Sequence, residues 1–130
     1  MHTRLRPEII LIAKNKHIKV SSFKNAQFFD DPEKNVFDAN SINLLPDENH
    51  GLHYMAPEFI EEPNITSPPM DLWALGCIIY QMVTGKKPFD ANKPHRIVQN
   101  IIDCNLMYDK QDNERLSDEC KDIINKLLNL

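Results

Sequence analysis

The sequence predicts a mainly α-helical domain with a small β-hairpin, in which the helices pack around one central, buried helix. Three observations support this fold class. Two short apolar stretches near the N-terminus are separated by a polar turn, which is typical of a β-hairpin. A long apolar segment in the middle of the chain lies between two prolines and a glycine, which are helix start and stop signals. Two later segments repeat apolar residues at helical spacing.

The hairpin and the loop after it come first along the chain. The apolar stretch 9–12 and the alternating stretch 17–20 flank a polar turn that contains Asn15, so we expect two paired strands. From Ser21 to about Asn49 the periodicity disappears and turn-forming residues dominate. An aperiodic segment of this length inside a compact chain indicates a functional or a disordered loop.

The central helix is predicted over residues 69–84. Pro68 and Pro69 fix its entry, Asp71 lies in the first turn where the helix dipole favours an anion, and Gly85 ends it. Apolar residues occupy nearly every side of this segment, and a helix that is apolar all round is expected to be buried.

Two further helices are predicted towards the C-terminus. One begins at Pro94 and continues through Ile102, and the other begins after Ser117, which is a good N-cap. The acidic stretch between Asp109 and Glu119 is predicted to be a solvated loop and helix start. Because no capping residue precedes the end at Leu130, we expect the chain to be part of a longer fold.

Composition limits the chain to one globular core and argues against nucleic-acid and membrane partners. Its 130 residues are 42% hydrophobic and 26% charged, which is ordinary for a globular domain. Because 15 Lys and Arg accompany 19 Asp and Glu, no basic excess neutralises phosphates, and we expect no nucleic acid. No apolar stretch approaches the ~20 residues of a membrane span, and no signal-peptide core follows the N-terminus. We therefore predict a cytoplasmic protein without membrane contact.

The cysteines and histidines indicate neither a disulfide nor a metal site. Cys77, Cys104 and Cys120 are odd in number and widely spaced, which favours free thiols. Two of them, Cys77 and Cys120, fall on apolar faces of predicted helices. The histidines lack the spacing of metal ligands.

Five motifs in order resemble the C-terminal lobe of a eukaryotic serine/threonine protein kinase. Residues 2–12, HTRLRPEIILI, lie over the family's catalytic loop, HRDLKPENILI. Residues 18–24, IKVSSFK, follow at the spacing of the strand and D-F-G turn, and residues 54–58, YMAPE, resemble the A-P-E end of the activation segment. Residues 71–76, DLWALG, match the D-x-W-x-x-G of the family's central helix, and the K-P-F of residues 87–89 follows it as expected.

The resemblance covers residues 1–130 and implies a partial kinase domain with no small lobe. Its parts are the catalytic-loop region 2–12, the activation-segment region 22–58 and the central helix 69–84. The central helix is most similar to the phosphoinositide-dependent protein kinase (AGC) branch. No glycine-rich loop is present, since the chain contains only three glycines.

The chain departs from the family where the chemistry takes place. The resemblance places Arg4 at the catalytic Asp and Arg6 at the loop Lys. Ile9 and Ser22 stand at the two magnesium-ligand positions, and Lys24 replaces the Gly of D-F-G. A guanidinium accepts no proton, and an alkyl side chain ligates no metal. We therefore predict no intact catalytic residue and no metal; ATP and magnesium belong only to the kinase alternative below.

The remaining motif residues are assigned structural roles by the resemblance. In the family, the residue at His2 anchors the catalytic loop, and the carboxylate at Asp71 accepts hydrogen bonds from the loop's backbone N–H groups. The full set is His2, Phe23, Ala56, Pro57, Glu58, Asp71, Trp73 and Gly76. Trp73 and Tyr80 are predicted to lie in the core. Glu58 is expected to lack the Arg with which the family pairs it. Ser41 resembles an activation-loop phosphosite, although a solvated loop serine is the default interpretation.

Three functional hypotheses follow. The first is a catalytically inactive, kinase-like lobe (a pseudokinase fragment) that binds a protein or peptide through the end of the activation segment and the groove lined by residues 94–104. The second is a serine/threonine protein kinase, or a fragment of one, that transfers phosphate from ATP once a small lobe is supplied. The third is a truncated gene product without a selected function.

Overall fold

The computed structural model describes residues 1–26, 37–38, 51–62 and 65–129. Its elements confirm the predicted class, a mainly helical chain with a small antiparallel hairpin. The strands are β1 (Ile10–Ile12), β2 (Ile18–Val20), β3 (Phe37–Asp38) and β4 (Ile65–Thr66). The α-helices are α1 (Pro57–Glu61), α2 (Pro69–Thr84), α3 (Pro94–Ile102), α4 (Lys110–Arg115) and α5 (Asp118–Leu127). Short 3-10 turns cover Pro7–Ile9, Phe23–Asn25 and Leu52–Tyr54.

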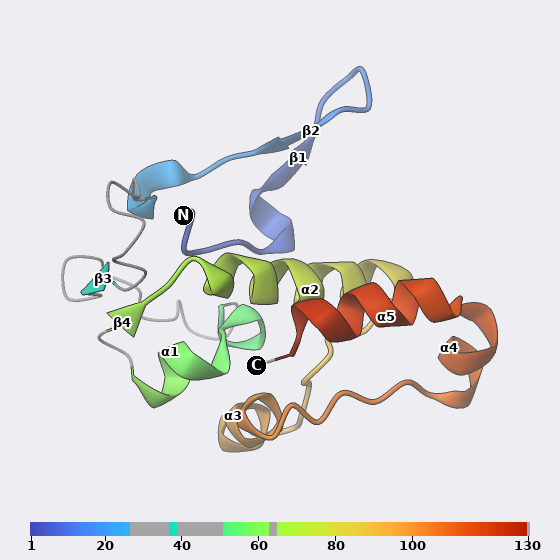
Figure 1. Ribbon diagram of the computed structural model, residues 1–130. Coiled ribbons are helices and arrows are strands. Elements are labelled where there is room, and N and C mark those ends of the chain that lie inside the picture. Colours follow the sequence, from blue (N-terminus) through green and yellow to red (C-terminus); the bar gives the residue numbers. More distant parts are fainter. Residues whose placement is uncertain (27–36, 39–50, 63–64, 130) are drawn as a thin grey trace.

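Helix α2 runs through the middle of the molecule, and the other described elements are arranged around it (Figure 1). Helix α5 lies along one side of α2, the N-terminal loop and the β1–β2 hairpin lie on another, and α1 and α3 lie below. Gly85 ends α2 in the left-handed conformation, with φ of 75°, as the sequence predicted. None of the helices in the described part of the chain is long and apolar enough to cross a membrane.

The core forms on the sides of α2 that face these neighbours. Trp73, Cys77 and Tyr80 are almost completely buried, and Trp73 stacks on Phe89 with ring centroids 5.5 Å apart. The predicted core positions of Trp73 and Tyr80 are therefore confirmed. Cys77, Cys104 and Cys120 are free thiols, as predicted, although the latter two are only half-buried.

The expectation that α2 is buried on every side is wrong. Leu72, Leu75 and Met82 are 53%, 38% and 78% exposed. These residues share one side of the helix, which is left partly exposed. The apolar character of a helix shows how much surface it can bury, and the number of neighbours determines how much it does bury.

Helices α2 and α5 meet at Gly76. A Cβ atom at this position would lie 2.8 Å from Leu128 Cδ2 and 2.9 Å from Leu127 Cβ, so only glycine allows this approach. Leu128 is 1% exposed, and its carbonyl accepts a hydrogen bond from Cys104 Sγ at 2.9 Å. The end of α5 is thereby fixed to both α2 and the segment that follows α3.

Two short helices were not predicted from the sequence. Helix α1 begins with Pro57 at its first position, and α4 begins after Asp109, whose side chain accepts from the Asp112 N–H at 2.8 Å. Both are standard helix-start signals. The interpretation of 109–119 as a solvated loop and helix start is therefore wrong for residues 110–115, which form α4 with Asp112 buried, and correct for the start of α5 at Asp118. Helix α3 ends at Ile102, as the sequence predicted. Cys104, two residues later, has a left-handed backbone conformation with φ of 45°, which does not continue the helix.

Candidate functional site

Asp71 holds the N-terminal loop on α2. Its Oδ2 accepts the His2 N–H at 2.6 Å, and its Oδ1 accepts the Thr3 N–H at 2.9 Å. Hydrogen bonds to a carboxylate are stronger than neutral ones. They stabilise the loop although Thr3 adopts a left-handed conformation with φ of 72°, which a β-branched residue rarely does. The carboxylate thus fastens the start of the loop to the first turn of α2.

His2 connects this loop to the segment after the hairpin. Its Nδ1 accepts the Arg4 N–H at 3.3 Å, so Nε2 carries the proton and donates to the Ser21 carbonyl at 2.9 Å. The ring also contacts Phe23 edge-on, at 5.0 Å between centroids. His2 is buried, whereas Phe23 is 60% exposed. The histidine therefore bonds two stretches of backbone together, which is a structural contact.

The three positions that the resemblance assigns to base and metal chemistry carry no carboxylate. Arg4 is half-buried in the loop, and Ile9 is buried at the start of the hairpin. The carbonyl of Ile9 accepts a hydrogen bond from the Ser21 N–H at 3.0 Å, so this backbone oxygen already has a partner. Ser22 is exposed and left-handed, with φ of 65°. Among the residues described, no three His, Cys, Asp or Glu side chains come together as metal ligands.

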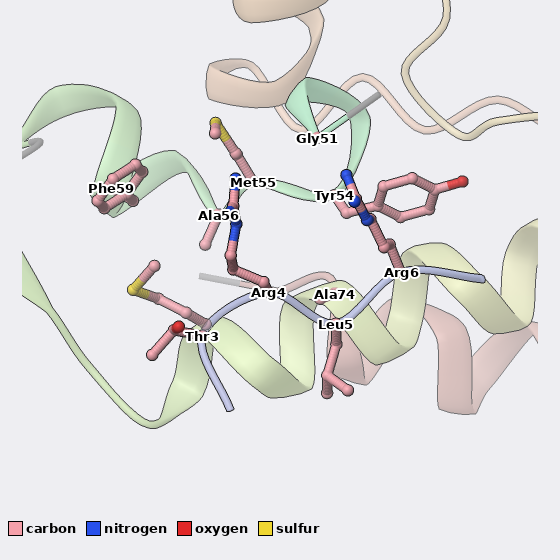
Figure 2. Close-up of a pocket in the computed structure, with 11 residues that line it drawn as sticks. Thr3, Arg4, Leu5, Arg6, Gly51, Tyr54, Met55, Ala56, Phe59 and Ala74 are labelled. Atoms are coloured by element: carbon pink, nitrogen blue, oxygen red, sulfur yellow. The ribbon is translucent and has the colours of Figure 1, made fainter. Parts of the chain in front are cut away.

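A pocket of about 510 Å³ of empty space, its mouth included, lies between this loop and the segment that precedes α1 (Figure 2). The loop contributes residues 3–6, the other wall contributes 51, 54–56 and 59, and α2 contributes Met70 and Ala74. Figure 2 shows the side chains of Arg4 and Arg6 extending from the loop towards the wall that carries Tyr54–Ala56. The Arg6 side chain is 23% exposed, and its Nε lies 3.8 Å from Glu8 Oε2.

The wall opposite the arginines is fixed by buried contacts. Ala56 is 1% exposed, and Pro57 is fully buried at the start of α1. The Tyr54 hydroxyl donates to Gln81 Oε1 on α2, and burial raises the pKa of Tyr54 to about 12. Tyr54 therefore stays neutral and holds the wall against α2 across the physiological pH range.

His53 and Glu58 lie beside this wall. His53 is 5% exposed, and no partner for its Nδ1 is found within the described structure. Burial lowers the pKa of His53, Lys87 lowers it further, and Asp90, whose Oδ1 lies 3.9 Å from Nε2, acts in the opposite direction. Glu58 is half-buried and forms no ion pair with any residue of the described ranges.

A second polar cluster was missed by the sequence analysis. Lys86, just after α2, bonds to Asp109 and lies 3.2 Å from Asp112 Oδ2. Arg115 lies 3.4 Å from Asp112 Oδ1 and donates to the Val83 carbonyl. This cluster joins the end of α2 to α4. The cap at Asp109 was the available signal for α4, but the pairing with Lys86 spans 23 positions and leaves no local pattern.

The structure places the remaining predicted site residues as follows. Trp73 and Gly76 face the core from α2, away from the pocket. Ser41, the candidate phosphosite, and much of the region 22–58 lie outside the described residues. Arg4 and Arg6 are brought to the pocket, whereas Ile9 and Ser22 do not line it.

Comparison with known proteins supports the interpretation of these motifs. The sequence of the chain matches the family model of the protein kinase domain over residues 1–130. The chain is 37% identical over 128 residues to human 3-phosphoinositide-dependent protein kinase 1, covering 98% of this chain and 21% of that protein. It is 36% identical over 126 residues to developmentally-regulated protein kinase 1 of Dictyostelium discoideum, covering 97% and 16%. It is 31% identical over 106 residues to serine/threonine-protein kinase PKH1 of Saccharomyces cerevisiae, covering 78% and 14%. The chain thus spans about a fifth or less of the length of these three relatives.

Proposed function

Because this chain belongs to the protein kinase family, in its phosphoinositide-dependent branch, we propose that it is a catalytically inactive kinase lobe that acts by binding another protein. The observation that carries the proposal is Arg4. It stands in the loop held by Asp71, where the family has the Asp that orients the substrate hydroxyl and accepts its proton. A guanidinium is always protonated and only donates hydrogen bonds, so it performs neither task.

The metal-ligand positions support the same conclusion. Magnesium is bound by oxygen atoms and is neutralised by carboxylates and phosphates. The Ile9 side chain offers no oxygen and is buried, and Ser22 offers a single neutral hydroxyl. These side chains do not fit a magnesium–ATP complex, and the proposed function requires no cofactor. Arg6 keeps the positive charge of the family's loop Lys but does not replace a metal ligand.

The proposed docking surface consists of the Leu52–Tyr54 turn, α1 and α3. Helix α3 packs against both the turn and α1, so the three form one continuous surface. A shallow groove at the start of α3 is lined by Ala91, Asn92, Lys93, His95, Arg96 and Asn100. Because its cations are exposed and no described acid lies among them, the groove fits an acidic protein segment.

A phosphorylation assay tests the inactivity. The purified 130-residue chain is incubated with labelled ATP, magnesium and a generic protein substrate, next to Asp71→Ala prepared in the same way. We expect equal, background incorporation in both samples, because any signal then comes from a contaminant that both share. Incorporation above the Asp71→Ala sample contradicts the proposal.

Site-specific photocrosslinking tests the docking surface. A photoreactive residue replaces His95 in the groove or, as a control, Lys19 on the exposed strand β2. We expect protein captured in cells from position 95 and not from position 19, and we expect Arg96→Glu to abolish it. Capture that is equal at both positions, or insensitive to Arg96→Glu, argues against this surface.

Kinase activity with a separately supplied small lobe is the second candidate, favoured by the kinase relatives and by the intact contacts of Asp71. A thermal-shift measurement separates the two. A ligand present at a hundred times its Kd stabilises a protein by about 2.7 kcal/mol. No shift of the melting temperature with millimolar ATP and magnesium supports the inactive lobe, whereas a shift of several degrees supports the kinase.

A further inference from the structure

His53 is a titratable side chain buried in a turn that forms part of the docking surface. The turn, Leu52–Tyr54, packs against α2 and α3. Its backbone closes through two hydrogen bonds. Tyr54 N–H donates to the Gly51 carbonyl at 3.1 Å, and Met55 N–H donates to the Leu52 carbonyl at 3.2 Å. Because His53 is only 5% exposed, its ring is packed between the turn and the neighbouring elements.

Neither ring nitrogen of His53 forms a hydrogen bond with a described residue. Nδ1 is buried and has no partner among these residues. Nε2 lies 3.9 Å from Asp90 Oδ1, which is beyond hydrogen-bond distance, and the Asp90 side chain is 63% exposed. A neutral ring carries one N–H group, whereas protonation adds a second N–H group and a positive charge. Protonation at this site therefore buries a charged donor without an acceptor, which is costly.

The charges around His53 do not compensate for this cost. Burial has the largest effect on the pKa of His53 and lowers it, Lys87 lowers it further, and Asp90 acts in the opposite direction. The start of α3, which packs on the turn, adds exposed groups that are basic and offer no carboxylate: Lys93, His95 and Arg96. The protonated ring is thus better accommodated in water than in the folded turn.

The other titratable groups on the elements beside the turn are neutral or bonded elsewhere. On α2, Asp71 accepts the N–H groups of residues 2 and 3, and burial raises the pKa of Cys77 and Tyr80. Lys86, just after α2, pairs with two acidic residues at and near the start of α4. Among the described residues, Asp90 is therefore the carboxylate that acts on the His53 ring.

We propose that His53 is a pH-sensitive switch: its neutral ring keeps the Leu52–Tyr54 turn packed against α3, and its protonated ring leaves this site and releases the turn. In water, both N–H groups of the released ring have acceptors. The docking surface is then ordered at neutral pH and loosened in mild acid. The switch is a property of the free chain, and it adds a regulation to the proposed protein binding, on which only that consequence rests.

The sign and the upper limit of the effect follow from proton linkage. The released ring has the ordinary pKa of 6.5, whereas the pKa of the buried ring is lower. The closed turn is therefore fully favoured above pH 6.5 and loses stability as the pH falls below it. If the buried ring bound no proton at all, the equilibrium constant for release would rise about tenfold between pH 7.5 and pH 5.5.

Amide hydrogen exchange in the 130-residue chain tests the switch. The exchange rates of the Tyr54 and Met55 N–H groups, which close the turn, are measured by NMR at pH 7.5 and pH 5.5 and divided by the intrinsic rate at each pH. We expect these corrected rates to rise about three- to tenfold at pH 5.5. They should also exceed the corrected rate of the Leu128 N–H, which bonds to the Ile124 carbonyl in the core, because the turn opens without global unfolding.

Matched variants assign the pH dependence to His53. His53→Gln should remove the rise, and His95→Gln, at an exposed position of α3, should keep it. Lys87→Gln should make the rise smaller, because Lys87 opposes a charge on the buried ring, and Asp90→Asn should make it larger, up to the tenfold limit. Urea midpoints confirm that each variant is folded, and the variants at 87 and 90 keep the test decisive if His53→Gln does not fold.

Three results would overturn the inference. A constant corrected rate in the unmodified chain shows that protonation does not release the turn. A rise that persists in His53→Gln assigns the pH dependence to another group. Turn amides that exchange no faster than the Leu128 N–H show that the proton acts through global stability alone. In each case the crosslinking from position 95 still decides the docking function independently.

Discussion

The helical core around α2 and the N-terminal layer on top of it differ in how they relate to the kinase family. In the core, Asp71, Trp73 and Gly76 all make tertiary contacts. In the N-terminal layer, the positions that the resemblance assigns to base and metal chemistry carry Arg4, Ile9 and Ser22. The two regions nevertheless remain joined, because Asp71 bonds to the backbone N–H groups of residues 2 and 3. Side chains at neighbouring loop positions can therefore change without loss of the contacts that shape the loop.

The largest effect should come from a phenylalanine of the core. Phe89 is 1% exposed and stacks on Trp73, so Phe89→Ala should lower the free energy of unfolding by about 3–5 kcal/mol in urea titrations. Phe23 of the N-terminal layer is 60% exposed, and Phe23→Ala should cost less than about 1 kcal/mol. Similar losses for both would show that the two regions are equally packed.

The next effect concerns the junction between the regions. Asp71→Ala leaves two backbone N–H groups without their acceptor and should cost about 2 kcal/mol or more. Hydrogen exchange at residues 2–5 should accelerate, while exchange in α5 should follow global stability. Asp122→Ala, which removes an exposed carboxylate from α5, should leave loop exchange unchanged. Unchanged exchange in Asp71→Ala would show that the loop is held by other contacts.

A third test compares a buried with an exposed ion pair. The Asp112 side chain is 4% exposed, but Lys86 and Arg115 are more than half exposed, so we expect Asp112→Asn to cost about 1–2 kcal/mol. The pair of Lys126 with Asp122 is exposed at both ends, and Asp122→Asn should cost less than about 0.5 kcal/mol. Equal urea midpoints for the two variants would contradict a role for the missed cluster in holding α4.

The smallest effect is a pH dependence from His53. Its pKa in the folded chain lies below the ordinary 6.5, mainly because the ring is buried. The unfolded chain therefore binds the proton first, and the stability contribution, full above pH 6.5, declines as the pH falls towards the folded-state pKa. His53→Gln should flatten the urea midpoint between about pH 7 and pH 5, whereas His95→Gln on the exposed start of α3 should not. If the urea midpoint depends on pH with the same slope in the two variants, His53 is not the source of the pH dependence.

Local signals predicted much of the fold. The hairpin, α2, α3 and α5 each follow from a periodicity and a boundary residue, such as Gly85 or Ser117, whose hydroxyl does accept the Cys120 N–H. The missed helices α1 and α4 are 5 and 6 residues long, which is too short for a periodicity to develop. The exposure of Leu72 and Met82 could not be predicted, because it depends on which elements surround α2.

The candidate site was less accessible to sequence reasoning. The resemblance that places Arg4 at the catalytic Asp can be read from the sequence, but the pocket is also lined by Gly51, Tyr54 and Met70, which come from distant segments. The shared direction of Arg4 and Arg6 depends on a loop backbone that is held by tertiary contacts, among them those of Asp71 and His2. The catalytic-loop motif therefore indicated which side chains differ from the family, whereas the three-dimensional arrangement was needed to show which residues line the pocket.

Helices α2 and α5 approach so closely at Gly76 that their spacing depends on this residue having a hydrogen atom as its side chain. A methyl group in its place would force the last turn of α5 outward, and Leu128 would carry the Cys104 thiol and the exit of α3 with it. One residue in the interior thereby sets the position of a chain segment beyond the helix that it contacts, because Leu128 links α2 to the exit of α3.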